Sequence, residues 1–157
     1  MTLSLALIMP RERALLAAAL APYFAETAPH AAIDPTERAG QMLHRKDVTA
    51  FWIRNGAQRI GFAIVLNLTD DRRELSEFCI LPQHRRRGWG QEAACLILQE
   101  FPGRWRMGLS KSSREAVAFW GTCLSFLPGL RDLREGAPFT GHQIKSYTFD
   151  VAGAHDD

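Results

Sequence analysis

The sequence predicts an α/β fold in which helices pack on a twisted sheet. Segments with the two-residue period of strands alternate along the chain with segments that have the helical period. Glycine, proline and Asn-Gly breaks separate these segments. The chain has 157 residues, of which 46% are hydrophobic and 23% charged, a composition typical of a globular domain with its own core. We therefore expect one domain over 1–152 and a loose C-terminal tail over 153–157.

The N-terminal segment predicts a strand followed by a helix. Apolar residues over 3–8 have a strand-like spacing, Pro10 suits the first turn of a helix, and 16–24 carry an apolar stripe at steps of three and four. We expect Pro22 to bend or end this helix. The alternative is a secretion signal, because 14–21 (ALLAAALA) is apolar. A strand in front of that run, where a signal peptide is polar, favours the structural interpretation.

The middle of the chain predicts a helix and an antiparallel sheet. Asn55-Gly56 between two apolar runs is a strong signal for a two-residue hairpin turn. The polar cluster Thr69-Asp70-Asp71 is typical of the next turn, and Pro82 ends the strand that follows it. The expected elements are a short helix over 36–44 and strands over 50–54, 58–66 and 74–81.

The C-terminal half begins with a helix that is apolar on most sides, so we expect it to be buried. Pro102-Gly103 ends it. Ser112 or Ser113 can cap the next helix with a side-chain oxygen. The expected elements, in chain order, are a helix over 91–101, a strand over 105–109, a helix over 114–123 and strands over 130–133 and 143–151.

Charge and cysteine content limit the class of protein. The formal net charge of +2 is too small to indicate a nucleic-acid or membrane surface, so we expect neither partner. The longest apolar run is shorter than the ~20 residues that a membrane span needs. Cys79, Cys95 and Cys123 have apolar neighbours and form no CxxC pair, which favours reduced thiols and a cytoplasmic location. The histidines lack the spacing of a zinc site, so we predict no metal.

A basic, glycine-containing turn over 82–91 (PQHRRRGWGQ) lies between a strand and a buried helix. The first turn of a helix leaves backbone N–H groups without partners, and these groups attract phosphates. Gly88 and Gly90 remove Cβ atoms where a ligand would approach the backbone. The turn is not a dinucleotide fingerprint, because Ala93 stands at the third glycine position, and no Gly-Lys-Ser/Thr of a Walker loop follows. The alternative is a solvated charge run with ordinary turn glycines.

The same turn resembles a motif of the GNAT acetyltransferase superfamily. Residues 85–90 (RRRGWG) are similar to its R/Q-x-x-G-x-G/A motif, and 78–82 resemble the strand that leads into it. Downstream, 113–120 resemble the family's N-x-x-A-x-x-F/L-Y helix, and 58–63 (QRIGFA) resemble an upstream strand. The resemblance covers roughly 1–125. It implies a mixed, mostly antiparallel twisted sheet with helices on both faces, splayed between the fourth and fifth strands.

The resemblance implies acetyl-CoA as co-substrate. The glycine turn would hold the pyrophosphate, the strand before it would pair with the pantetheine arm, and the downstream helix would touch the pantetheine or acetyl end. A backbone N–H of that strand would polarise the thioester carbonyl. The residues implied are Cys79, Ile80 and Leu81 on the strand, Arg85, Arg86, Arg87, Gly88, Trp89, Gly90 and Gln91 in the turn, and Ser113 and Phe119 downstream.

The implied reaction is direct attack of an amine on the thioester, in which a base helps the amine lose a proton. Glu77 is our candidate base, with a solvent-facing or ion-paired carboxylate as the alternative. Trp120 stands where the family often has a tyrosine acid, and Ser113 where asparagine is usual. Tyr147 is our candidate acid, with packing on the sheet as the alternative; Tyr23 is the other phenol.

Three functions compete at this point. The first is an N-acetyltransferase that acts on the primary amine of a small molecule or peptide. The second is a non-catalytic acyl-CoA sensor on the same fold, suggested by the missing tyrosine. The third is a nucleic-acid binder that uses the arginine turn, which the low net charge disfavours. Four acidic residues over 70–77 hint at a cationic acceptor, and the resemblance implies that the C-terminal strands can mediate a homodimer.

Overall fold

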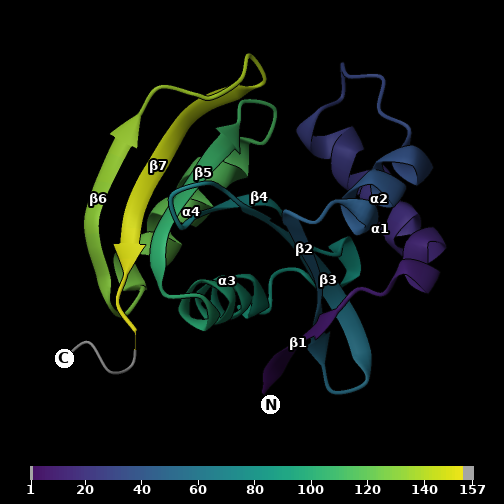
Figure 1. Cartoon of the computed structure of the whole chain (residues 1–157), viewed down its shortest axis with the longest axis horizontal. Helices are drawn as coiled ribbons and strands as arrows, with labels where there is room; N and C mark the ends of the chain where they lie inside the picture. The colour runs from purple at the N-terminus through teal and green to yellow at the C-terminus, as the bar shows by residue number, and fades with distance from the viewer. Residues whose placement is uncertain (1, 154–157) are drawn as a thin grey trace.

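The computed structural model describes residues 2–153, which form one seven-stranded sheet with helices on both faces (Figure 1). The strand order is β1-β2-β3-β4-β5-β7-β6, and every pairing is antiparallel except β4 with β5. This mixed, mostly antiparallel sheet confirms the predicted fold class. The strands are β1 (Leu3–Leu7), β2 (Val48–Asn55), β3 (Gln58–Asn67), β4 (Arg72–Ile80), β5 (Gly103–Ser110), β6 (Leu130–Gly136) and β7 (Gln143–Val151). The helices are α1 (Arg13–Thr27), α2 (Pro35–His44), α3 (Trp89–Glu100) and α4 (Arg114–Phe126), with short 3-10 turns η1 (Pro10–Glu12) and η2 (Pro82–His84).

Two hydrophobic cores hold the helices against the sheet. On β2, Trp52 packs with the core beneath α1 and α2, whereas its neighbours Phe51 and Ile53 pack with the core beneath α3 and α4. Leu16 and Leu20 of α1 are fully buried in the first of these cores. The two-residue period of the strands therefore supplies both faces with apolar side chains, as a sheet covered on both sides requires.

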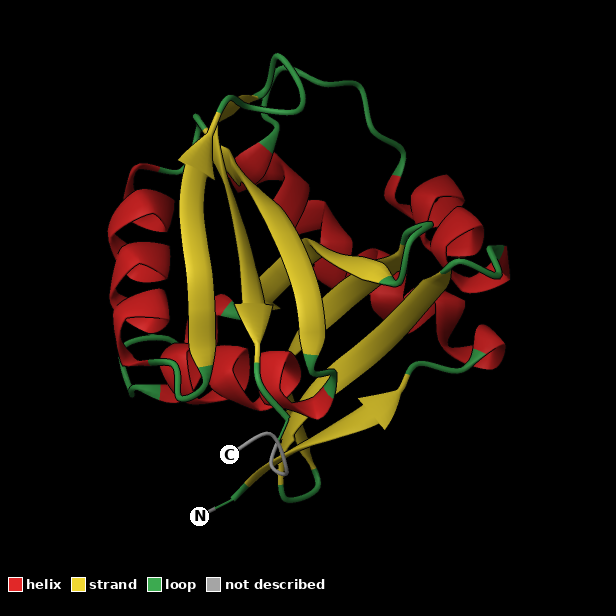
Figure 2. Ribbon diagram, turned by 60° about the vertical axis from the view of Figure 1, so that its left-hand side comes forward, coloured by secondary structure: helices red, strands yellow, loops and turns green. Residues whose placement is uncertain are grey.

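The sheet is splayed between β4 and β5. These strands pair in parallel only where 72–74 lie beside 104–106, and beyond that point β5 continues with β7 while β4 stays with β3. Figure 2 shows the strands diverging into two groups. The splay predicted between the fourth and fifth strands is thus confirmed, and it leaves an edge of β4 without a neighbouring strand.

A β-bulge lies in β4 next to the point of divergence. Ile64 pairs with Glu77 but its neighbour Val65 pairs with Leu75, so Ser76 is an extra residue in the strand. A bulge shifts the alternation of side chains by one position. As a result Leu75 packs in the core beneath α3 and α4, while Glu77 faces the side of α1 and α2.

Most predicted elements are present, with three differences. Helix α1 runs through Pro22 to Thr27, because the proline is exposed while Leu20 and Phe24 anchor the other side of the helix in the core. The hairpin turn lies one residue later than predicted, since Asn55 still pairs with Gln58. Ser113 occupies the N-cap position of α4 without a capping hydrogen bond from its side chain.

Most of the predicted tail, 154–157, lies outside the described residues. No helix between residues 2 and 153 is long and apolar enough to span a membrane.

Candidate functional site

A cleft of about 570 Å³ opens where β4 and β5 separate. We call it the β4–β5 cleft. Its floor comes from the unpaired edge of β4 and from the end of β5, α1 closes one side, and α3 and α4 close the other. The residues that line it are Tyr23, Glu26, Thr27, Leu75, Ser76, Phe78, Cys79, Ile80, Arg85, Arg86, Gly88, Gly90, Gln91, Met107, Gly108, Leu109, Ser110, Ser113, Glu115, Ala116, Phe119 and Trp120. Its volume is that of a typical ligand site.

The N-terminus of α3 points its free amides at this cleft. Gly88 is the N-cap in the left-handed region (φ 78°), and the first amide with a partner is that of Glu92, 3.4 Å from the Gly88 carbonyl oxygen. Within residues 2–153 no protein acceptor binds the amides of 86–91. Such a helix end attracts anions, because both the N–H groups and the helix dipole favour negative charge.

The two glycines of the turn serve different structural purposes. A Cβ on Gly88 would meet nothing within 4 Å, so the glycine serves the left-handed backbone and leaves the space in front of it open. A Cβ on Gly90 would lie 3.0 Å from the Phe119 ring. Gly90 therefore lets the first turn of α3 approach α4 closely.

Two of the three arginines in the turn already contact other residues of the protein through their side chains. The Arg85 side chain donates to the Ile80 carbonyl at 2.7 Å and to the Glu26 carboxylate at 3.1 Å, so it ties the end of β4 to α1. The Arg87 guanidinium lies 5.4 Å from the centre of the Trp89 ring. Arg86, in the left-handed region at φ 65°, lines the cleft and forms no ion pair with any described residue.

The backbone of β4 faces the cleft at alternate residues. The Leu81 amide donates to Ile60 of β3 at 2.8 Å, so the Cys79 backbone faces β3 as well. The backbone groups of Phe78 and Ile80 therefore face the open edge, and the Ile80 carbonyl accepts from Arg85 there. Of the three strand residues predicted to contact the pantetheine arm, Ile80 has its backbone groups on the open edge. The backbone groups of Cys79 and Leu81 face β3 instead.

Glu77 and Tyr23 form a hydrogen-bonded pair beside the cleft. The Tyr23 hydroxyl donates to Glu77 Oε2. Burial raises the pKa of Glu77 to about 7, although the hydrogen bond from Tyr23 and the charge of Arg38 act in the opposite direction. Burial, followed by the neighbouring Glu77, raises the pKa of Tyr23 well above its usual value. A carboxylate that is partly ionised at neutral pH is suited to general base catalysis.

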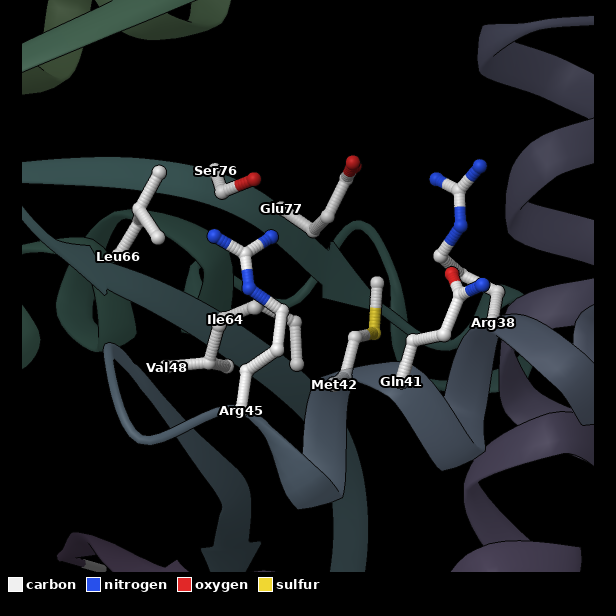
Figure 3. A pocket seen from close by; sticks show the side chains of 9 residues that line it. All are labelled: Arg38, Gln41, Met42, Arg45, Val48, Ile64, Leu66, Ser76 and Glu77. Atoms are coloured by element: carbon white, nitrogen blue, oxygen red, sulfur yellow. The ribbon is translucent and has the colours of Figure 1, made fainter.

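The Glu77 side chain itself lines a second, smaller cavity of about 180 Å³ under α2 (Figure 3). We call it the α2 pocket. Ser76, the bulged residue of β4, lines both cavities. The Glu77–Tyr23 pair therefore links them, since Tyr23 lines the β4–β5 cleft and Glu77 lines the α2 pocket.

Tyr147, the predicted acid, lies elsewhere. It is 5% exposed, packs in the core beneath α3 and α4, and its hydroxyl is 3.4 Å from a carboxylate oxygen of Glu135. It does not line the β4–β5 cleft. Trp120, which stands at the position of the expected tyrosine, does line it, with its ring centre 5.3 Å from that of Phe78.

The cleft brings together most of the predicted cofactor residues. Leu81, Arg87 and Trp89 lie beside it without lining it. The predicted residues that line it are Cys79, Ile80, Arg85, Arg86, Gly88, Gly90, Gln91, Ser113 and Phe119. Sequence reasoning missed Phe78 on the open edge, although the period of the strand places it opposite Glu77, and it missed the end of β5, for which the sequence carries no local signal.

Cys79 and Cys123 are small buried side chains, and Cys95 is half-buried. Burial raises the pKa of Cys79 to about 11 and that of Cys123 to about 12, so both thiols stay protonated at neutral pH. His84, next to the arginine turn, is buried, with its ring centre 6.1 Å from that of Trp89.

Comparison with known proteins gives one family. The model of the acetyltransferase (GNAT) family matches residues 14–124. An acetyltransferase from Thermus thermophilus superposes with a TM-score of 0.70 at 21% identity, over 96% of this chain and 98% of that one. An aminoglycoside acetyltransferase in complex with coenzyme A gives 0.73 at 16% identity, over 96% and 95%. An N-acetyltransferase from Thermoplasma acidophilum in complex with coenzyme A gives 0.63 at 12% identity, over 97% and 100%. No curated protein matches the sequence.

Proposed function

The chain belongs to the acetyltransferase (GNAT) family, and from that premise we propose that it is an N-acetyltransferase that transfers the acetyl group of acetyl-CoA to a primary amine. The observation that carries the proposal is the row of amides over 86–91, which have no acceptor within residues 2–153 and lie at the β4–β5 cleft, together with the Glu77–Tyr23 pair, whose tyrosine lines the same cleft. Structural neighbours that were crystallised with coenzyme A support the choice of co-substrate.

The residues present fit acetyl-CoA. The amides of Gly88, Trp89 and Gly90 are available for the pyrophosphate, and the open space at Gly88 leaves room for it. Arg86, which has no ion pair within residues 2–153, offers its guanidinium beside them. The backbone groups of Phe78 and the Ile80 amide face the open edge and are available for the pantetheine arm, as in strand addition, whereas the Ile80 carbonyl accepts from Arg85.

Acetyl-CoA supplies an activated acetyl thioester when it is bound. Glu77 accepts the proton that the amine loses, directly or through one water, because its raised pKa keeps it a competent base near neutral pH. The backbone N–H of Phe78 or Ile80 polarises the thioester carbonyl. Tyr23 orients the Glu77 carboxylate through its hydrogen bond and itself lines the cleft.

Tyr23 is our choice for the phenol that serves the departing thiolate. It lines the cleft, whereas Tyr147 does not. Its raised pKa makes it a weak acid towards a thiolate whose conjugate acid has a pKa of ~8.5. We therefore assign Tyr23 the role of hydrogen-bond donor and of relay for the proton held by Glu77, which is the stronger acid of the pair. Tyr147 stays a prediction that a matched substitution can test.

Two measurements test the proposal. Acetyl-CoA at millimolar concentration should raise the melting temperature, because a ligand that binds only the folded state stabilises it. Addition of primary amines should then release free thiol and form an acetylated product. An unchanged melting temperature would contradict the proposal. Binding without thiol release across a broad amine panel would favour the acyl-CoA sensor instead.

A further inference from the structure

The α2 pocket has a chemical character of its own. Figure 3 shows side chains rising from α2 and facing Ser76 and Glu77 on β4. Its volume of about 180 Å³ corresponds to roughly six water molecules at about 30 Å³ each, so it suits the end of a small molecule. The lining residues are Arg38, Gln41, Met42, Arg45, Val48, Ile64, Leu66, Ser76 and Glu77.

The charges in this pocket are predominantly positive. Glu77 is the one carboxylate among its lining residues, and its raised pKa leaves it only partly ionised near neutral pH. Arg45 is matched by Asp47, with a bidentate ion pair at 2.6 and 2.9 Å. Arg38 has no ion pair with any described residue.

Arg38 packs against Phe24 and lines the α2 pocket together with Glu77. Its guanidinium carbon lies 5.6 Å from the centre of the Phe24 ring, and its charge lowers the pKa of Glu77. It therefore stands close to the candidate base while keeping donors free for a ligand. A guanidinium with free donors binds a carboxylate or phosphate in a two-pronged geometry.

Three of the four acidic residues that hinted at a cationic acceptor lie outside the α2 pocket. Glu74 is paired with Arg106 at 2.6 Å. Asp70 and Asp71 lie exposed in the turn between β3 and β4. None of these three lines the α2 pocket, where Arg38 is the arginine that forms no ion pair with a described residue.

We propose that the α2 pocket binds the acceptor and that the acceptor is a small amine carrying a carboxylate or phosphate group, which Arg38 binds while the amine faces Glu77. This inference rests on the proposed acetyl transfer. Ser76, which lines both cavities, marks the place where the amine passes from the pocket towards the thioester. Arg38 is thus the residue that sets acceptor specificity.

The test compares acceptors in matched pairs at saturating acetyl-CoA. Each pair is an amino acid and its methyl ester, or an aminoalkyl phosphate and the corresponding amino alcohol, and a polyamine serves as the cationic probe. We expect kcat/KM to favour the anionic member by about 10- to 100-fold, the range of one charged hydrogen-bonded contact. The two kinds of pair show whether the anion is a carboxylate or a phosphate. Preference for the esters or for the polyamine would overturn the proposal.

Arg38→Gln removes the charge and keeps most of the side chain. We expect it to raise KM for the anionic acceptors by about 10-fold or more and to leave KM for the esters within about threefold. Because Arg38 lowers the pKa of Glu77, the variant should also move the pH dependence of ester acetylation to higher pH. The matched control is Arg59→Gln, which likewise removes an arginine over an aromatic ring but outside both cavities. An Arg38→Gln enzyme that keeps the preference for anions would contradict the assignment.

Direct binding separates this inference from the proposed function. Anionic amines alone should raise the melting temperature of the wild type more than their esters do, and should not do so in Arg38→Gln. If they do but no thiol is released from acetyl-CoA, the transfer proposal fails and the anion site stands. If uncharged amines are acetylated without any preference, the anion site fails and the transfer proposal stands.

Discussion

The two sides of β4 hold cavities that are built in different ways. The β4–β5 cleft presents main-chain groups, namely the amides at the start of α3 and the open edge of the strand. The α2 pocket presents side chains that come from α2, β2, β3 and β4. A main-chain site depends on glycines and helix ends, so it suits an invariant phosphate. A side-chain site can change with single substitutions, so it suits an acceptor that differs between related enzymes.

The largest expected effect comes from blocking the main-chain site. Gly88→Asp places a carboxylate in the open space in front of the free amides, so we expect acetyl-CoA affinity to fall by more than about 100-fold, or about 3 kcal/mol. Calorimetry with acetyl-CoA measures this. The control is Gly56→Asp in the β2–β3 turn, where the backbone is also left-handed and the surrounding space also empty. Both variants should lose similar stability, and equal affinities in the two would show that the phosphate site lies elsewhere.

The second effect concerns the carboxylate between the two cavities. Glu77→Gln should lower kcat/KM by about 100-fold or more at pH 7, the usual range for loss of a general base. In the wild type, kcat/KM should rise with pH through about 7 as Glu77 ionises. The variant should lack that rise and show only the ionisation of the amine. A variant that retains the same profile would remove Glu77 from the mechanism.

A smaller effect distinguishes the two phenols. Tyr23→Phe removes the hydroxyl that bonds Glu77, so we expect kcat/KM to fall by about 10-fold, the value of one hydrogen bond to a charged group. Tyr147→Phe is the matched change outside the cleft and should alter kcat/KM by less than about twofold. The reverse order would return the acid role to Tyr147.

The last effect concerns stability and not activity. The pKa of Glu77 is raised in the folded protein from about 4.5 to about 7, so the folded state binds this proton more tightly than the unfolded state does. Stability should therefore fall as pH rises between these values, by up to about 3 kcal/mol. Glu77→Gln removes this penalty, so its melting temperature should exceed that of the wild type at pH 8 and match it more closely at pH 5. A constant difference across this range would mean that Glu77 titrates normally.

Sequence reasoning was most successful where the signal is local. The period of the strands, the turn dipeptides and the glycine turn are short-range features, and the predicted order of strands and helices agrees with the structure. The glycine turn could be related to free amides because a helix start always exposes them.

The side-chain pocket could not be found in this way. Arg38 lies on α2 and Glu77 on β4, and no pattern in the sequence links them across the fold. Tyr23 could be named as a phenol but not paired with Glu77, since that contact joins residues 54 positions apart. Pro22 does not end α1, because core packing outweighs the local preference, and the predicted bend at this residue stays a prediction.

The bulge at Ser76 shows how a single inserted residue can place neighbouring side chains of one strand on opposite faces of the sheet. Without it, the alternation would put Leu75 and Glu77 on the same face, and either a hydrophobic anchor would be lost or an acid would enter the hydrophobic interior. Deletion of this one codon would keep the family motif and the net charge intact. Leu75 could then no longer pack in the core while Glu77 faces the α2 pocket.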